Sequence, residues 1–251
     1  MAAHCGAGNM IQTLVSKKGI GMPRETFERG LKHLQDDLLL LGSLVEQAVR
    51  DSVDALKRRD LEASRLIYLA DREINERRYE IEQNCLILIA TQQPMARDLR
   101  MLAAILEVNT ELERIGDYAK GICQINLLLG REPLVKPLVD IPRMADLGLD
   151  MLHRALGAFV AQDAGTARAI PLEDDQVDAL YNQVYRDLLQ IMMADPTVID
   201  RANYLIWAAH NLERLADRVT NICERVVFLV TGQIIELDQS GKERIPNANP
   251  Y

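Results

Sequence analysis

The chain contains 251 residues, of which 48% are hydrophobic and only 4% are aromatic. This balance is typical of helix bundles, because β-sandwiches and barrels favour aromatic and β-branched residues. The formal net charge of −8 argues against a nucleic-acid-binding protein, which normally carries a basic face. No apolar run approaches the roughly 18 residues that a membrane span requires. We therefore expect an all-α protein that binds no nucleic acid.

The first helices of the chain are marked by apolar residues that recur in alternating steps of 4 and 3. One such seam starts at Phe27 and predicts a helix over residues 24–58. Asp60 can cap a second helix, which Pro94 stops. The seam of this second helix is expected to contain Leu66, Leu69, Ile74, Ile81, Leu86 and Ile89.

A third helix is predicted from about Ala96 to the stop signal formed by Gly130 and Pro133. The pattern then recurs, with helices expected at about 143–160, 164–193 and 197–231. Pro171 interrupts the fifth pattern and should kink or break that helix, since an interior proline removes a hydrogen bond.

This recurrence predicts two tandem, internally duplicated three-helix bundles with six long helices. The first bundle is expected to span residues 22–132 and the second residues 133–238, each with enough residues for a core of its own. Residues 1–21 lack the continuous apolar stretch of a signal peptide, and we predict a disordered extension there. Residues 239–251 are polar, contain two prolines and are predicted to be a disordered tail.

The four cysteines, Cys5, Cys85, Cys123 and Cys223, show no CxxC spacing. Three of them lie inside apolar helical patterns. Reduced, buried thiols in a cytosolic protein are therefore the interpretation that fits them best.

The most informative feature is a repeated pair of acids on the third helix of each unit. "ELERIGD" at 111–117 contains Glu113 and Asp117, and "NLERLAD" at 211–217 contains Glu213 and Asp217. Four residues apart on a helix, like charges share one face and repel by roughly 0.2–0.5 kcal/mol. A bound hard cation would turn this repulsion into attraction.

Each middle helix offers a second stripe of oxygen ligands. Asp71 and Asn75 form it in the first unit, and Asp174 and Asp178 form it in the second. Asn109 extends the stripe of the third helix, and the stripe of the sixth helix also includes His210, Asn221 and Glu224. Carboxylates on neighbouring bundle helices are how many metal sites are built. These oxygen ligands favour magnesium, manganese, calcium or ferric iron over tetrahedral zinc.

The residues alone leave other interpretations open. An acidic stripe is most often a solvated face, here paired with Arg114, Arg214 or Arg218, and a lone histidine such as His210 is most often a surface or packing residue. The chain lacks a Ser-His-Asp set and a glycine-rich phosphate loop. A carboxylate-bridged metal enzyme is also conceivable, although the Glu-x-x-His motif of di-iron bundles is absent from the helices.

Taken together, the paired motifs in paired bundles resemble the PhoU family, the accessory proteins of the phosphate-specific transport system. The resemblance extends over residues 22–238, with "PRETFERGLKHLQDDLLLLG", "ARDLRMLAAILEVNTELERIGDYAKGI" and "NLERLADRVTNICE" as its clearest segments. It implies a cytoplasmic, non-enzymatic negative regulator of the phosphate-starvation response. Such a protein would link the ATPase subunit of the phosphate ABC transporter to a membrane sensor histidine kinase. It would meet the membrane only through these partners and would be a homodimer.

The resemblance also assigns site residues. It implies iron, zinc, magnesium or manganese on the acidic motifs, held by Glu113, Asp117, Glu213 and Asp217 with the middle-helix residues Asp71, Asn75, Asp174 and Asp178. Asn221 matches a frequent asparagine of the family, whereas the first unit has Gly121 at that position.

Overall fold

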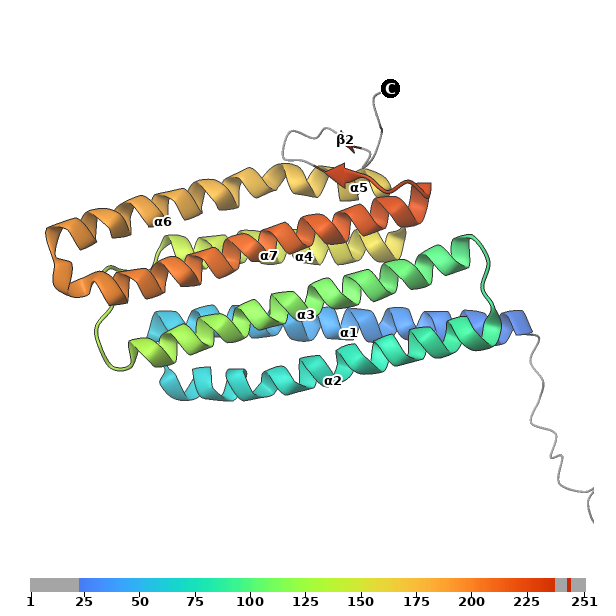
Figure 1. The fold of residues 1–251 in the computed structure, drawn as a ribbon, viewed down its shortest axis with the longest axis horizontal. Coiled ribbons are helices and arrows are strands. Elements are labelled where there is room, and N and C mark those ends of the chain that lie inside the picture. Colours follow the sequence, from blue (N-terminus) through green and yellow to red (C-terminus); the bar gives the residue numbers. More distant parts are fainter. Residues whose placement is uncertain (1–22, 238–242, 245–251) are drawn as a thin grey trace, which may run out of the picture.

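The computed structural model describes residues 23–237 and 243–244, and six long helices make up most of this part. The first bundle consists of α1 (Pro23–Arg58), α2 (Leu61–Gln92) and α3 (Arg97–Leu129). The second consists of α4 (Asp140–Ala161), α6 (Asp174–Ala194) and α7 (Ile199–Thr231). Figure 1 shows the two bundles side by side, with α3 against α7 at the junction and with α2 and α6 at opposite edges. The predicted all-α fold with six long helices is confirmed.

Shorter elements complete the described chain. They are α5 (Ala164–Ala169), the 3₁₀ turns η1 (Ile170–Glu173) and η2 (Pro196–Val198), and the strands β1 (Glu236–Leu237) and β2 (Glu243–Arg244). The strands pair antiparallel, which the sequence did not predict. The predicted extension at 1–21 lies outside the described residues, as does the predicted tail apart from β2.

The fifth helix is divided where its proline predicts a break. α5 ends before Pro171, which lies in η1, and α6 begins only at Asp174. Because proline has no backbone N–H, it is tolerated in the first turn of a helix but not in its interior. The fourth helix begins three residues earlier than predicted, at Asp140.

Aspartates cap the helices α2 and α5, and the cap predicted at Asp60 is confirmed. Asp60 Oδ1 accepts hydrogen bonds from the backbone N–H groups of Glu62 and Ala63, at 3.1 and 2.9 Å. Asp163 does the same for Gly165 and Thr166, at 2.9 and 3.1 Å. Each cap provides a hydrogen-bond acceptor for backbone N–H groups of the first turn, which have no carbonyl partner within the helix.

The predicted seam of α2 is partly wrong. Leu66, Leu69 and Leu86 are exposed, whereas Asp71, Ile74, Ile81 and Cys85 are buried. In the predicted seam, Leu69 and Ile74 are five residues apart. Side chains on one face of a helix are three or four residues apart, so Leu69 and Ile74 do not share the buried face. α2 is an outer helix, so only the stripe facing α1 and α3 is covered.

The two bundles do not have separate cores, contrary to the expectation from unit length. One continuous cluster of buried apolar side chains includes residues of both bundles. α3 packs along α7, and α1 packs along α4. A Cβ placed at Gly42 of α1 would lie 2.5 Å from Leu156 Cδ1 of α4, so these helices approach closely because Gly42 has no side chain. Among the described residues, no helix combines the length and apolar character needed to cross a membrane.

Asn126 is a buried polar residue that ties α3 to the α1–α2 turn. Its side-chain N–H groups donate to the carbonyl oxygens of Ala55 and Asp60 and to the hydroxyl of Ser64, at 3.1, 3.2 and 2.8 Å. Its Oδ1 accepts a hydrogen bond from Arg59. The second bundle has Val226 at the equivalent position, so this anchor belongs to the first bundle alone.

Replacing Asn126 by alanine should destabilise the protein by about 2–3 kcal/mol, because buried hydrogen-bonding groups lose their partner. Chemical denaturation of Asn126→Ala would measure the loss. Gln124→Ala, on the exposed face of the same helix, is the control and should change stability by less than about 0.5 kcal/mol. Equal stability of the two variants would contradict the role given to Asn126.

The three described cysteines should be inert in the folded protein. Cys85, Cys123 and Cys223 are fully buried free thiols, and burial raises the pKa of each to about 12. Because the thiolate is the reactive form, a Cys5→Ser variant should not react with a thiol reagent until it is unfolded, when all three should react. Rapid labelling of the native variant would show that the core opens readily.

Candidate functional site

The candidate site is organised by the crossing of α3 and α7. Glu111 of α3 contacts Asn221 of α7, and Gly121 of α3 lies against Asn211 of α7. The two contacts show that the helices run antiparallel, with their crossing near Gly116. The sequence repeat relates the third helices by a shift of 100 residues, so the two contacts are equivalent under an approximate twofold axis.

In the first bundle, the structure brings Asp71 of α2 close to the acidic pair on α3. Asp71 is buried, with 6% of its surface exposed, and its Oδ2 accepts a hydrogen bond from Asn75 Nδ2 at 2.9 Å. Lys120 Nζ donates to the same oxygen at 2.6 Å and lies 4.0 Å from Asp117 Oδ1. The predicted oxygen stripe of α2 therefore faces α3, and Lys120 lies between Asp71 and Asp117.

The surroundings of the α3 pair raise the pKa values of both carboxyls. For Glu113 the largest cause is burial, followed by repulsion from Asp117, while Arg78 opposes the shift. For Asp117, burial and repulsion from Asp71 raise the pKa and Lys120 lowers it. The three carboxyls are thus close enough to repel one another.

In the second bundle, Asp178 of α6 faces the acidic pair on α7. Burial is the main cause of the raised pKa of both Glu213 and Asp217, and Asp178 raises both further. His210 Nδ1 lies 3.0 Å from Glu213 Oε2 and lowers the pKa of this carboxyl. Asp174 is buried at the first residue of α6.

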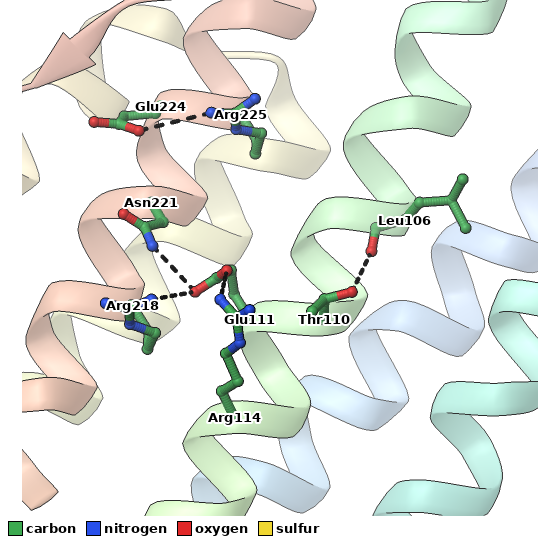
Figure 2. Close-up of polar contacts among 8 residues, drawn as sticks. All are labelled: Leu106, Thr110, Glu111, Arg114, Arg218, Asn221, Glu224 and Arg225. Atoms are coloured by element: carbon green, nitrogen blue, oxygen red, sulfur yellow. Dashed lines mark hydrogen bonds and ion pairs between the residues drawn. The ribbon is translucent and has the colours of Figure 1, made fainter.

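Asn221 does not share the surroundings of Glu213 and Asp217. Its Nδ2 donates to Glu111 Oε2 at 3.2 Å, across the junction between the bundles (Figure 2). Arg114 Nη1 donates to the other oxygen of Glu111 at 2.7 Å, and Arg218 contacts Oε2 at 3.4 Å. The structure thus gives Asn221 a contact with the other bundle, and its role as a metal ligand stays a prediction.

The long stripe predicted on α7 divides into parts with different neighbours. Glu224 Oε1 accepts a hydrogen bond from the backbone N–H of Leu237 at 2.9 Å, which ties β1 to the helix. From His210 to Glu224 a helix rises by roughly 21 Å, so one stripe can pass several neighbours. Asn109 is buried as well and donates to the Arg78 carbonyl at 2.9 Å, which makes it a packing contact of α2 and α3.

The residues of the two acidic centres meet only part of what a metal ion requires. Each centre supplies carboxylates from two neighbouring helices that repel one another, which is the chemistry of a hard-cation site. Across residues 23–237, however, no three His, Cys, Asp or Glu side chains lie close enough to hold an ion as they stand. Metal binding would therefore require side-chain movement, and in the first bundle it would also require displacement of Lys120 from Asp71.

Sequence reasoning missed three charged residues that shape these sites: Arg78, Glu111 and Lys120. Lys120 is three residues after Asp117, a spacing that could have signalled an ion pair. Glu111 and Arg78 gave no such signal, because their contacts depend on how α3 packs against α7 and α2.

Comparison with known proteins places this architecture in a family. The model of the PhoU domain matches residues 38–125 and again residues 141–226, once in each bundle. Phosphate-specific transport system accessory protein PhoU homologs from Clostridium acetobutylicum and Caulobacter vibrioides are 33% and 35% identical to this chain. These alignments cover 86% and 83% of this chain and 100% and 91% of the relatives.

Solved structures give the same result. The crystal structure of the phosphate transport system regulatory protein PhoU from Streptococcus pneumoniae matches with a TM-score of 0.78 and 33% identity, covering 84% of this chain and 100% of that one. PhoU from Pseudomonas aeruginosa also matches with a TM-score of 0.78, at 34% identity, covering 82% and 100%. With the domain present twice and relatives aligned over nearly their whole length, this chain belongs to the PhoU family.

Proposed function

We propose that this protein is an accessory regulator of phosphate uptake. Relatives that align over most of the chain are named accessory proteins of the phosphate-specific transport system, and this observation carries the proposal. In this role the protein is a cytoplasmic adaptor between the ATPase subunit of the phosphate ABC transporter and a sensor histidine kinase, and it restrains the phosphate-starvation response. It acts by binding rather than by catalysis.

In the proposed adaptor role, the two acidic centres bind metal ions and form contact faces for partners. A metal ion held by Glu213, Asp217 and Asp178 would neutralise carboxylates that otherwise repel. The chain's own residues supply the centre: α6 and α7 carry its ligands, and His210 Nδ1 lies 3.0 Å from Glu213 Oε2. A loaded centre then presents a compact, rigid face to a partner.

Apolar side chains on α2 support an interaction surface. Leu66, Leu69 and Leu86 expose 62%, 68% and 53% of their surfaces on one outer helix. Leu66 and Leu69 lie one turn apart, whereas Leu86 is roughly 26 Å further along the helix, so only the first two form a group of the kind that marks protein–protein contacts. We place a partner or the second chain of a homodimer there.

Glu213 and Asp217 should lower the free energy of unfolding when no metal is bound. A carboxyl whose pKa is raised on folding binds more protons in the folded state, so its contribution becomes more unfavourable as the pH rises through that pKa. In chelator at neutral pH, the double variant Glu213→Gln/Asp217→Asn should gain at least roughly 0.2–0.5 kcal/mol, the repulsion of the pair. Its advantage should shrink as the pH falls and the wild-type carboxyls become neutral.

Thermal unfolding from neutral to acidic pH measures this difference. Glu107→Gln removes an exposed carboxylate of α3 and is the matched control. A double variant that is less stable than the wild type at neutral pH would mean that the acids are already compensated within the protein.

Partner capture tests the proposed function itself. Tagged protein recovered with membranes of phosphate-replete cells should bring down the transporter ATPase and a sensor histidine kinase, identified by mass spectrometry. A variant with Glu113 and Glu213 changed to Gln and Asp117 and Asp217 changed to Asn should recover less of both, because it cannot form a loaded centre. Recovery of neither partner by the wild type would overturn the proposal.

A further inference from the structure

We propose that a cavity between α1, α2 and α3 is a binding site for a small neutral organic molecule with an apolar body and one hydroxyl group. The ligand would be about the size of phenol. This site needs no metal ion and goes beyond the proposed adaptor role. Two features of the cavity point to it: apolar walls of suitable size, and a buried carboxylate oxygen without a partner.

The cavity lies within the first bundle and has a volume of about 160 Å³. Most of its wall is apolar and comes from all three helices: Leu44 and Ala48 of α1, Ile67, Ala70 and Ile74 of α2, and Ala119 of α3. An apolar cavity of about 150 Å³ is large enough to hold benzene. A molecule with a single six-membered ring therefore fits this space.

Small residues of α3 leave the room for a ligand. Gly116 is part of the cavity wall, and a Cβ at this position would lie only 3.2 Å from Ile74 Cδ1 and Cγ2. The repeat places larger residues, Ala216 and Val219, at the positions of Gly116 and Ala119. The small side chains that line the cavity are therefore specific to the first bundle.

Asp71 supplies the polar contact for a ligand. It lines the cavity, and only 6% of its surface is exposed. Its Oδ2 accepts hydrogen bonds from Asn75 and Lys120, whereas its buried Oδ1 has no hydrogen-bond partner within the described part of the chain. A buried acceptor without a partner is unfavourable, because it has lost its contacts with water. A hydrogen-bond donor inside the cavity would remove this penalty.

The apolar walls favour an organic molecule over water as that donor. A buried water molecule typically makes about three hydrogen bonds to polar groups. Gln47, Asp51 and Glu73 also line the cavity, but their side chains are exposed and form its solvent edge. An organic molecule can donate to Asp71 Oδ1 and cover the apolar walls at the same time, and burial of apolar surface is favourable.

The charges around the cavity select a neutral ligand. Lys120 lines the cavity with its Nζ 2.6 Å from Asp71 Oδ2, so a second cation there would be repelled by the ammonium group. An anion would be repelled by Asp71 and, at the solvent edge, by Asp51 and Glu73. A hydroxyl group avoids both penalties. It can donate to Asp71 Oδ1, and its oxygen can accept a hydrogen bond from Lys120.

Phenol and toluene are suitable probes, because they share a ring and differ only in a hydroxyl or a methyl group. The full chain, with labelled isoleucine methyl groups and in the presence of a chelator, is titrated with each probe and followed by nuclear magnetic resonance. Phenol should shift the methyl signals of Ile67 and Ile74, which line the cavity, and leave Ile206 of α7 unchanged.

Three variants locate the contacts of the ligand. Asp71→Asn should weaken phenol binding roughly fivefold or more and leave toluene binding unchanged, because a charged acceptor forms the stronger hydrogen bond. Ala70→Leu adds bulk to the cavity wall and should weaken both probes. Ala90→Leu makes the same change at an exposed position further along α2 and should weaken neither. Circular dichroism shows whether the variants are folded.

Several outcomes would overturn the inference. The first is a titration in which phenol leaves the Ile67 and Ile74 signals unchanged, since water alone would then occupy the cavity. Equal phenol binding by the wild type and Ala70→Leu would place phenol elsewhere on the protein. Equal weakening of phenol and toluene by Asp71→Asn would remove the role given to Oδ1. Should Asp71→Asn fail to fold, Ala70→Leu and Ala90→Leu still decide whether the cavity is the site.

The test is independent of the proposed function. The chelator removes metal ions, and no partner protein is present in the titration. Failure of phenol to bind would leave the adaptor role standing, and failure of partner capture would leave the cavity site standing.

Discussion

The antiparallel packing of α3 against α7 is the contact on which the rest of the structure depends. Both helices carry an acidic pair, and both belong to the one continuous core that joins the bundles. At their crossing, Glu111 of one bundle is held by Arg218 and Asn221 of the other. A buried carboxylate without such partners would cost several kcal/mol, so these charges fix the register of the two helices as well as their contact.

This junction leaves one flank of each helix for the acidic centres. The α3 pair faces α2 and the α7 pair faces α6, away from the crossing, and each pair is repelled by a carboxylate of its neighbour. Repulsion of this kind lowers stability and has no packing benefit. Strained or repulsive groups that a fold tolerates are commonly found at functional sites, where another purpose maintains them.

Duplication gave the protein two versions of one centre, and the versions have diverged in charge. In the first, Lys120 lies between Asp71 and Asp117. The second has Thr220 in place of that lysine and a fourth carboxylate, Asp178, in place of Asn75. A symmetric fold can therefore carry asymmetric chemistry, since the backbone repeat is set by apolar residues and the charges vary independently of it.

The sequence by itself determined the helices, their duplication and the acidic pairs, because apolar periodicity, aspartate caps and prolines act within a few residues along the chain. It also located the break at Pro171. Only the tertiary structure decided which faces are covered, which polar groups meet and how the bundles join: Leu69 is exposed, Asn221 reaches Glu111, and Lys120 pairs with Asp71. These outcomes depend on contacts between residues about 50 to 110 positions apart, and local patterns cannot encode the relative rotation of packed helices.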